Sequence, residues 1–152
     1  MENKDTIKKC KKHNEEFKYT LFGYCCVSCY NENLIKNKDI CENFVNCRNL
    51  KQKTKHLFIE KYPNNILILY SYGYHFPLSI KLLDNTILIN SNGYSNTTAR
   101  HKGNLCRALG FNGFKDVEQN KGEDILIFST SQLKEILEKG FKNKSEIAES
   151  KI

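Results

Sequence analysis

Apolar residues follow two different spacings along the chain, and the change occurs near residue 63. Over residues 31–62 the apolar positions are scattered at helix-like intervals, without Gly or Pro, which predicts one or two helices. Residues 62–65, Tyr-Pro-Asn-Asn, interrupt this pattern, because the residue before Pro is displaced from helical geometry and Asn suits a turn. We therefore expect a helical connector over residues 31–62.

The segment after this turn has the spacing of β-strands. Residues 66–72 form a compact apolar run, residues 77–83 alternate, and residues 86–90 follow an Asp-Asn pair that suits a tight turn. Two runs joined in this way predict a β-hairpin, and the first run extends it to a three-stranded antiparallel meander. Residues 125–128 form a fourth apolar run, which we also interpret as a strand.

Two amphipathic helices are predicted on either side of that last strand. The first begins at residues 95–98, where Ser95, Thr97 and Thr98 offer N-caps, and it ends at Gly110. The second begins with the capping box of residues 129–132 and ends at Gly140. Their apolar faces comprise His101, Leu105, Ala108 and Leu109 in the first helix and Leu133, Ile136 and Leu137 in the second. The polar residues 142–152 predict a flexible tail.

The seven cysteines favour metal binding over a disulfide framework. The chain begins with charged residues and has no run of eighteen apolar residues, so we expect a cytoplasmic protein without a membrane span. Thiols stay reduced in the cytosol, where close cysteine pairs more often hold a metal than form disulfides.

Four potential zinc ligands form two close pairs near the amino terminus. Cys10 and His13 are separated by two residues, as are Cys26 and Cys29. This gap lets both members of a pair reach one ion from a tight turn, and two pairs complete the tetrahedral shell of structural zinc. Cys25 is the rival of Cys26, but only Cys26 has the two-residue gap to Cys29. A shell of four protein ligands has no open position for water, which argues against hydrolytic zinc.

The twelve residues between these pairs predict a short strand pair that links two zinc knuckles. A second, incomplete metal site is conceivable at Cys41, Cys47 and His56. The competing interpretation is that these three residues are buried thiols and a surface imidazole.

The amino-terminal segment resembles the Cys-x2-His…Cys-x2-Cys zinc ribbons of many phage and bacterial DNA-associated proteins. Residues 10–17 match the first knuckle of those ribbons and residues 26–29 the second, with Asn14 in place of the usual Gly and Val27 in place of the usual Pro. The resemblance implies a structural zinc ion. Ribbons of this kind serve in nucleic-acid binding and also as purely structural clips.

A second resemblance covers the centre of the chain. Tyr-Ser-Tyr-Gly at residues 70–73, followed by Tyr-Ser-Asn-Thr-Thr-Ala-Arg-His at residues 94–101, is similar to a small domain of uncharacterised bacteriophage proteins. This resemblance implies a bacteriophage origin, and hence the host cytoplasm as the location. It implies no activity.

The predicted strands, helices and zinc site together indicate an α+β fold in four parts. We expect a small zinc ribbon over residues 8–30, the helical connector, a small antiparallel sheet packed with two helices over residues 63–141, and the tail.

The same central pattern contains candidate anion-binding side chains. The N–H groups of a helix N-terminus beside Arg and Thr can hold a phosphate, and nearby tyrosines can stack on bases. Alternatively, the threonines cap the helix and His101 packs against the sheet, which its place on the apolar face favours. The candidates are Tyr72, Tyr94, Thr97, Thr98, Arg100 and His101.

The net charge of +7 is uneven. Residues 1–62 contain thirteen Lys and Arg against eight Asp and Glu, whereas residues 63–152 contain eleven against nine. This excess suits a polyanionic partner, although a surface that only maintains solubility has the same composition. The candidate nucleic-acid contacts of the connector are Arg48, Lys51, Lys53 and Lys55.

No P-loop, Gly-x-Ser-x-Gly, His-Glu-x-x-His or nuclease carboxylate cluster occurs in the sequence. Our leading hypothesis is a non-enzymatic, zinc-stabilised phage accessory protein that binds nucleic acid through a basic surface. One alternative is a protein that binds and inhibits a host factor. Another is a small enzyme that uses His101 and Arg100 on a phosphate-bearing substrate.

Overall fold

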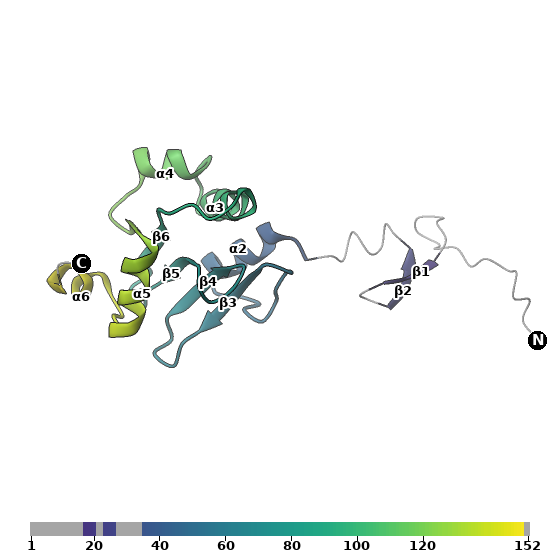
Figure 1. The fold of residues 1–152 in the computed structure, drawn as a ribbon, viewed down its shortest axis with the longest axis horizontal. Helices are drawn as coiled ribbons and strands as arrows, with labels where there is room; N and C mark the ends of the chain where they lie inside the picture. Colours follow the sequence, from purple (N-terminus) through teal and green to yellow (C-terminus); the bar gives the residue numbers. More distant parts are fainter. Residues whose placement is uncertain (1–16, 21–22, 27–34, 151–152) are drawn as a thin grey trace, which may run out of the picture. The chain divides into compact units, whose positions relative to one another are not determined.

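The computed structural model describes residues 17–20, 23–26 and 35–150 (Figure 1). The chain divides into two compact units, residues 1–35 and residues 36–152.

The amino-terminal unit contains an antiparallel strand pair. Strand β1 spans Phe17–Thr20 and β2 spans Gly23–Cys26, with Phe17 opposite Cys26 and Thr20 opposite Gly23. The strand pair predicted between the two zinc knuckles is therefore confirmed. Cys10, His13 and Cys29 lie outside the described residues, and only the backbone of Cys26 is described.

The second unit is built on a five-stranded mixed sheet, with its strands in the order β3-β4-β5-β6-β7. The first four strands are antiparallel and β7 is parallel to β6. The predicted meander is confirmed, but the sheet is not wholly antiparallel, because the chain crosses over through helices before it enters β7. The strands are β3 (Leu57–Lys61), β4 (Leu67–Ser71), β5 (Pro77–Lys81), β6 (Ile87–Asn90) and β7 (Ile125–Phe128).

Five helices occur in the described part of this unit. They are α2 (Asn37–Asn46), α3 (Asn96–Ala108), α4 (Phe114–Asn120), α5 (Thr130–Lys139) and α6 (Lys144–Ser150). The predicted caps of α3 and α5 are confirmed: Ser95 accepts from the N–H of Thr98, and Ser129 forms a capping box with Gln132. None of the helices in residues 35–150 has the length and apolar character needed to cross a bilayer.

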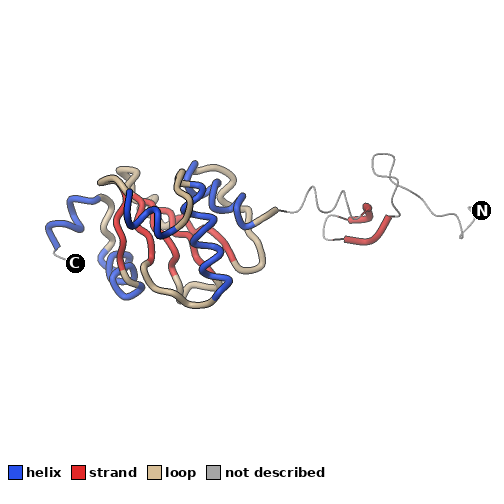
Figure 2. Tube along the Cα trace, turned by 90° about the horizontal axis from the view of Figure 1, so that it is seen from above, coloured by secondary structure: helices blue, strands red, loops and turns tan. Residues whose placement is uncertain are grey.

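Helices pack on both faces of the sheet (Figure 2). On one face, Ile68, Ile80 and Leu88 form a core with Leu133 of α5 and Ile147 of α6. On the other face lie α2 and α3, which also pack against each other. In Figure 1, α5 and α6 lie together, apart from α2 and α3. The apolar run at residues 66–70 does not alternate because both of its faces are buried.

One sequence-based expectation is wrong in the segment that precedes β4. Residues 57–61 form the edge strand β3 and not part of a helix, and Leu57 and Ile59 alternate in burial with their neighbours. The described part of the 31–62 segment contains one helix, α2, in agreement with the prediction of one or two, and residues 36–62 belong to the same compact unit as the sheet.

The carboxy-terminal residues 144–150 are helical, whereas the sequence predicted a flexible tail. Ile147 is almost fully buried in the core beneath α5, and the Asn143 side chain accepts from the N–H of Glu146. The N–H of Lys144 also donates to Asp84 in the turn between β5 and β6. One buried apolar side chain and several polar contacts, including one from Lys144 Nζ to the carbonyl of Glu123, thus hold a segment whose composition is polar.

Candidate nucleic-acid interface

Three of the four predicted basic residues of the connector line an open groove. The groove has a volume of about 860 Å³ and lies between the α2–β3 loop and the edge strand β3. Its one carboxylate, Glu60, accepts a hydrogen bond of 2.7 Å from the Tyr74 hydroxyl. We call it the lysine groove, and its lining residues are Leu50, Lys51, Gln52, Lys53, Thr54, Lys55, Phe58, Ile59, Glu60, Lys61 and Tyr74. Arg48, also predicted, is exposed in the same loop but does not line the groove.

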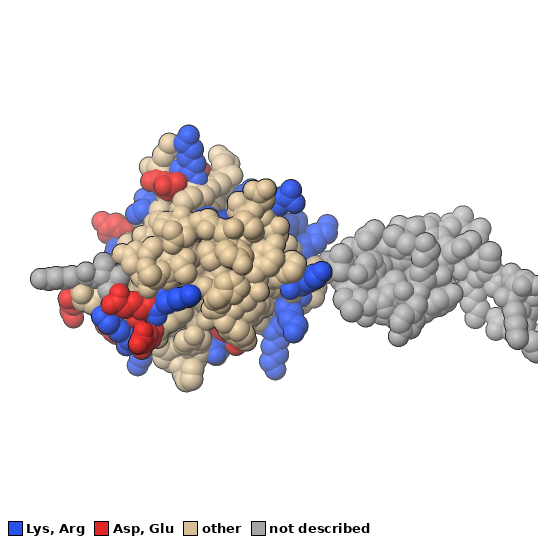
Figure 3. All heavy atoms as spheres, in the orientation of Figure 1, with Lys and Arg blue, Asp and Glu red and all other residues tan. Residues whose placement is uncertain are grey.

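Positive and negative charges are separated within this unit. Residues 36–115 contain twelve Lys and Arg and four Asp and Glu, a net charge of +8, whereas residues 116–150 contain five and eight, a net charge of −3. Figure 3 shows Lys and Arg gathered on the side of α2, and most of the visible Asp and Glu toward α5 and α6. The lysine groove therefore lies on the positive side, where a polyanion is attracted.

A cluster of aromatic and histidine rings lies at the same end of the sheet as the start of β3. The ring centroids of His56 and Tyr72 are 4.4 Å apart, those of Tyr72 and Tyr94 are 5.9 Å apart, and those of His75 and Tyr94 are 5.4 Å apart. We call His56, Tyr72, His75 and Tyr94 the aromatic patch. The predicted pair Tyr72 and Tyr94 is thus brought together from the two ends of the β4–β6 segment.

Tyr72 has an unusual backbone conformation. Its φ is +71°, in the left-handed region that bulky side chains avoid, and the next residue, Gly73, has a φ of +156°. The N–H of Tyr72 donates to the carbonyl of His56 at 2.7 Å, which holds the turn in this conformation. Strain of this kind costs on the order of 1–2 kcal/mol and often occurs at functional positions.

His101 lies behind the patch in a buried hydrogen-bond chain. Its Nδ1 lies 2.7 Å from Ser71 Oγ, and its Nε2 lies 3.2 Å from Asn37 Nδ2. Since the Asn37 amide nitrogen is a donor, Nε2 accepts and Nδ1–H donates to Ser71. The chain continues through Ser71 to the Thr98 hydroxyl, and through Asn37 to the Thr54 hydroxyl of the lysine groove.

Burial explains the protonation state of His101. The side chain is fully buried, and this desolvation, assisted by the charge of His56, lowers its pKa from the ordinary value of 6.5. The direction of this chain is the reverse of a hydrolase triad, because the imidazole N–H donates to Ser71, whereas in a triad the imidazole accepts the serine proton. Ser71 and His101 are also both buried, so a substrate does not reach them in this structure. His101 therefore packs between the helix and the sheet, as its position on the apolar face of α3 suggested.

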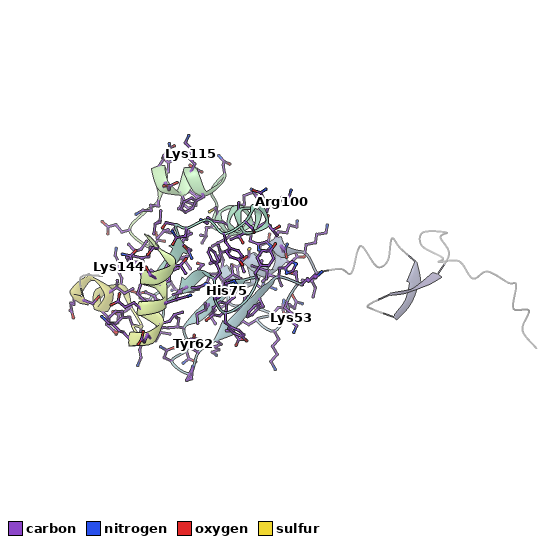
Figure 4. All side chains as sticks on the ribbon, in the orientation of Figure 1. Lys53, Tyr62, His75, Arg100, Lys115 and Lys144 are labelled. Atoms are coloured by element: carbon purple, nitrogen blue, oxygen red, sulfur yellow. The ribbon has the colours of Figure 1, made fainter. Side chains whose placement is uncertain are left out.

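The remaining predicted residues of the helix start divide between surface and interior. Arg100 is exposed and Thr97 is half-buried, whereas Thr98 is fully buried and bonded to Ser71 and Ser95. Tyr94 is 56% exposed, so Tyr94 and Arg100 are the most accessible members of the predicted set. In Figure 4, His75 of the aromatic patch lies toward the middle of the face that is shown, with Arg100 and Lys53 to one side of it.

The cysteines of this unit do not gather with other potential metal ligands. Within residues 35–150 no three His, Cys, Asp or Glu side chains surround a common point, so Cys41, Cys47 and His56 are not brought together as a ligand set. Cys47 is exposed, whereas Cys41 and Cys106 are buried. Burial raises the pKa of Cys41 to about 12 and that of Cys106 to about 11, so both remain thiols.

Sequence reasoning missed several residues of this region. Ser71 and Asn37 hold the two nitrogens of His101, although they are 30 and 64 residues away in the chain. Nothing in their local sequence indicates these contacts. The charge separation, in contrast, is visible in the sequence, because residues 85–115 contain no Asp or Glu.

Comparison of this chain with protein-family models, curated proteins and solved structures gives no match.

Replacement of Tyr72 tests the backbone strain. Tyr72→Gly and Tyr72→Ala both remove the ring, but only Gly adopts a positive φ without steric cost. We expect the Gly variant to have a higher free energy of unfolding than the Ala variant, by about 0.5–1 kcal/mol in urea denaturation, because the relief of about 1–2 kcal/mol of strain is partly offset by the larger conformational entropy that Gly loses on folding. Tyr94 is not at positive φ, so Tyr94→Gly should be no more stable than Tyr94→Ala. Equal stability of the two Tyr72 variants would show that the turn is unstrained.

The buried imidazole predicts a pH dependence of stability. The unfolded chain gains a proton at His101 as the pH falls below about 6.5, while the folded protein, with its lowered pKa, resists protonation. The contribution of His101 is therefore complete above pH 6.5 and decreases as the pH falls below it. We expect His101→Gln to flatten the decline in unfolding free energy between pH 7 and pH 5. His75→Gln, at an exposed histidine, is the matched control, and an equal effect of both changes would contradict the assignment.

Proposed function

We propose that this protein binds nucleic acid through the lysine groove. The observation that supports the proposal is the composition of the groove wall: Lys51, Lys53, Lys55 and Lys61 face one carboxylate, and the Tyr74 hydroxyl occupies an oxygen of that carboxylate. Lysines that neutralise phosphates release condensed counterions, which drives binding. The wall also contains two aromatic rings, a combination found in proteins that bind nucleic-acid strands.

The positions of the lysines suit a surface site. Lys51, Lys53 and Lys55 are exposed, and no carboxylate lies between Glu42 and Glu60 in the sequence. An enclosed lysine would lose its charge or require a buried partner, whereas these side chains keep their hydration until a ligand arrives. Such a groove attracts polyanions over a distance limited by salt, with a Debye length of about 8 Å at 0.15 M.

We further propose that Cys10, His13, Cys26 and Cys29 hold one structural zinc ion. The strand pair β1–β2, with Cys26 as its last residue, supports this, because two knuckles need a short connection of that kind. Zinc would supply folding free energy to a segment too small for a core of its own. The two resemblances support a role as a phage accessory protein that associates with nucleic acid.

A charge reversal tests the groove. Lys51→Glu combined with Lys53→Glu should weaken binding to a fluorescent oligonucleotide and reduce the slope of log affinity against log salt by about 2, because two phosphate contacts are lost. Lys121→Glu is a matched control, since Lys121 is exposed and lies outside the groove. No binding at low salt, or an equal loss in the control, would contradict the proposal.

Elemental analysis tests the zinc site. The purified full chain should contain one zinc ion per molecule, and Cys26→Ser should lose it, because only Cys26 has the two-residue gap to Cys29. Cys25→Ser changes the neighbouring thiol and should retain the metal. Zinc-free wild-type protein, or loss of zinc in the Cys25 variant alone, would refute this ligand set.

A further inference from the structure

We infer that the aromatic patch stacks on unpaired bases, so that the ligand of this protein is a single strand and not a duplex. This inference rests on the proposed function, because it specifies which nucleic acid the basic surface binds. Every base has a π face, and stacking on an aromatic side chain is available only to bases that are not stacked inside a duplex.

The patch offers accessible rings in a region without negative charge. Tyr94 is 56% exposed, and His75 is exposed beside it. Figure 3 shows that the middle of this face carries neither Lys and Arg nor Asp and Glu, while Lys and Arg border it on the side of α2. An uncharged aromatic centre with a basic border is complementary to a strand whose bases turn inward and whose phosphates lie outside.

The patch continues directly into the lysine groove. His56 follows Lys55 of the groove in the chain, and its ring packs on Tyr72. Tyr74, which lines the groove and is 65% exposed, precedes His75 of the patch. A strand bound by the lysines therefore has exposed rings within reach of its bases, and Arg100 lies on the same side of His75 as Lys53 in Figure 4.

The loop that carries Tyr94 is held in place before any ligand binds. The carbonyl of Asn92 accepts from the buried Lys102 Nζ at 3.0 Å, and its side-chain oxygen accepts from the N–H of Thr130 at 2.7 Å. The N–H of Asn92 donates to the side chain of Asn90 at 2.8 Å. Tyr72 is held from the other side by its strained turn. Rigid rings lose little conformational entropy on binding, which favours affinity.

Binding of matched single-stranded and duplex oligonucleotides to the full chain tests the inference. Each base stacked on an aromatic ring contributes about 1–3 kcal/mol, so Tyr94→Ala should weaken single-strand binding roughly 5- to 150-fold. Duplex affinity and the salt slope should not change, because the phosphate contacts remain. Tyr94→Phe should preserve single-strand affinity. Leu83→Ala is the matched control, since Leu83 is 49% exposed in the turn at the other end of β5.

The outcomes separate this inference from the proposed function. Preferential single-strand binding that Tyr94→Ala reduces, with the thermal midpoint unchanged, supports the inference. Equal binding of both probes with no effect of Tyr94→Ala overturns it and leaves the lysine groove as a backbone-binding site. No binding of either probe at low salt overturns both.

Discussion

The side chain of His101 connects the parts of the molecule that carry the candidate interface. It lies on α3, contacts β4 through Ser71 and α2 through Asn37, and reaches the lysine-bearing loop through the hydroxyl of Thr54. A buried imidazole is stable in such a place only when it is neutral and both ring nitrogens have partners. One set of complementary donors and acceptors therefore links β4, α2 and the loop, in addition to the apolar contacts of Ile40 and Phe44.

Because both faces of the sheet are buried, side chains that could contact a ligand are accessible only at the strand ends and edges. Along β4 every residue from Leu67 to Ser71 is buried, and the helices on either face exclude water. The chain reaches solvent at the strand ends, where the β4–β5 turn and the β6–α3 loop carry Tyr72, His75 and Tyr94. The lysines of the α2–β3 loop follow the edge strand β3, from Lys51 after Leu50, which lies near Lys61, to Lys55 close to the start of the strand. Aromatic rings and positive charges from three segments thus share one surface.

Predictions from sequence succeeded where the signal is local. Ser95 and the capping box at Ser129 satisfy N–H groups within the same helical turn, and Gly140 adopts a φ of +71° at the end of α5. They failed where the partner is distant. The apolar residues of the edge strand β3 have a helix-like spacing in the sequence, and only their pairing with β4 makes the segment a strand. Ile147 of α6 is an isolated apolar residue in the sequence, and only the tertiary structure shows that it packs in the core with α5.

The sequence by itself determined the helix caps of α3 and α5, the β4–β6 meander, the β1–β2 strand pair and the basic character of residues 48–55, because each depends on neighbours within a few residues. Only the tertiary structure decided that β7 runs parallel to β6, that His101 is buried between Ser71 and Asn37, and that Tyr72 and Tyr94 form one patch beside the lysine groove. These features depend on contacts between residues 22 to 64 positions apart. Such contacts form through shared burial and paired hydrogen bonds, which leave no periodic signal in the chain.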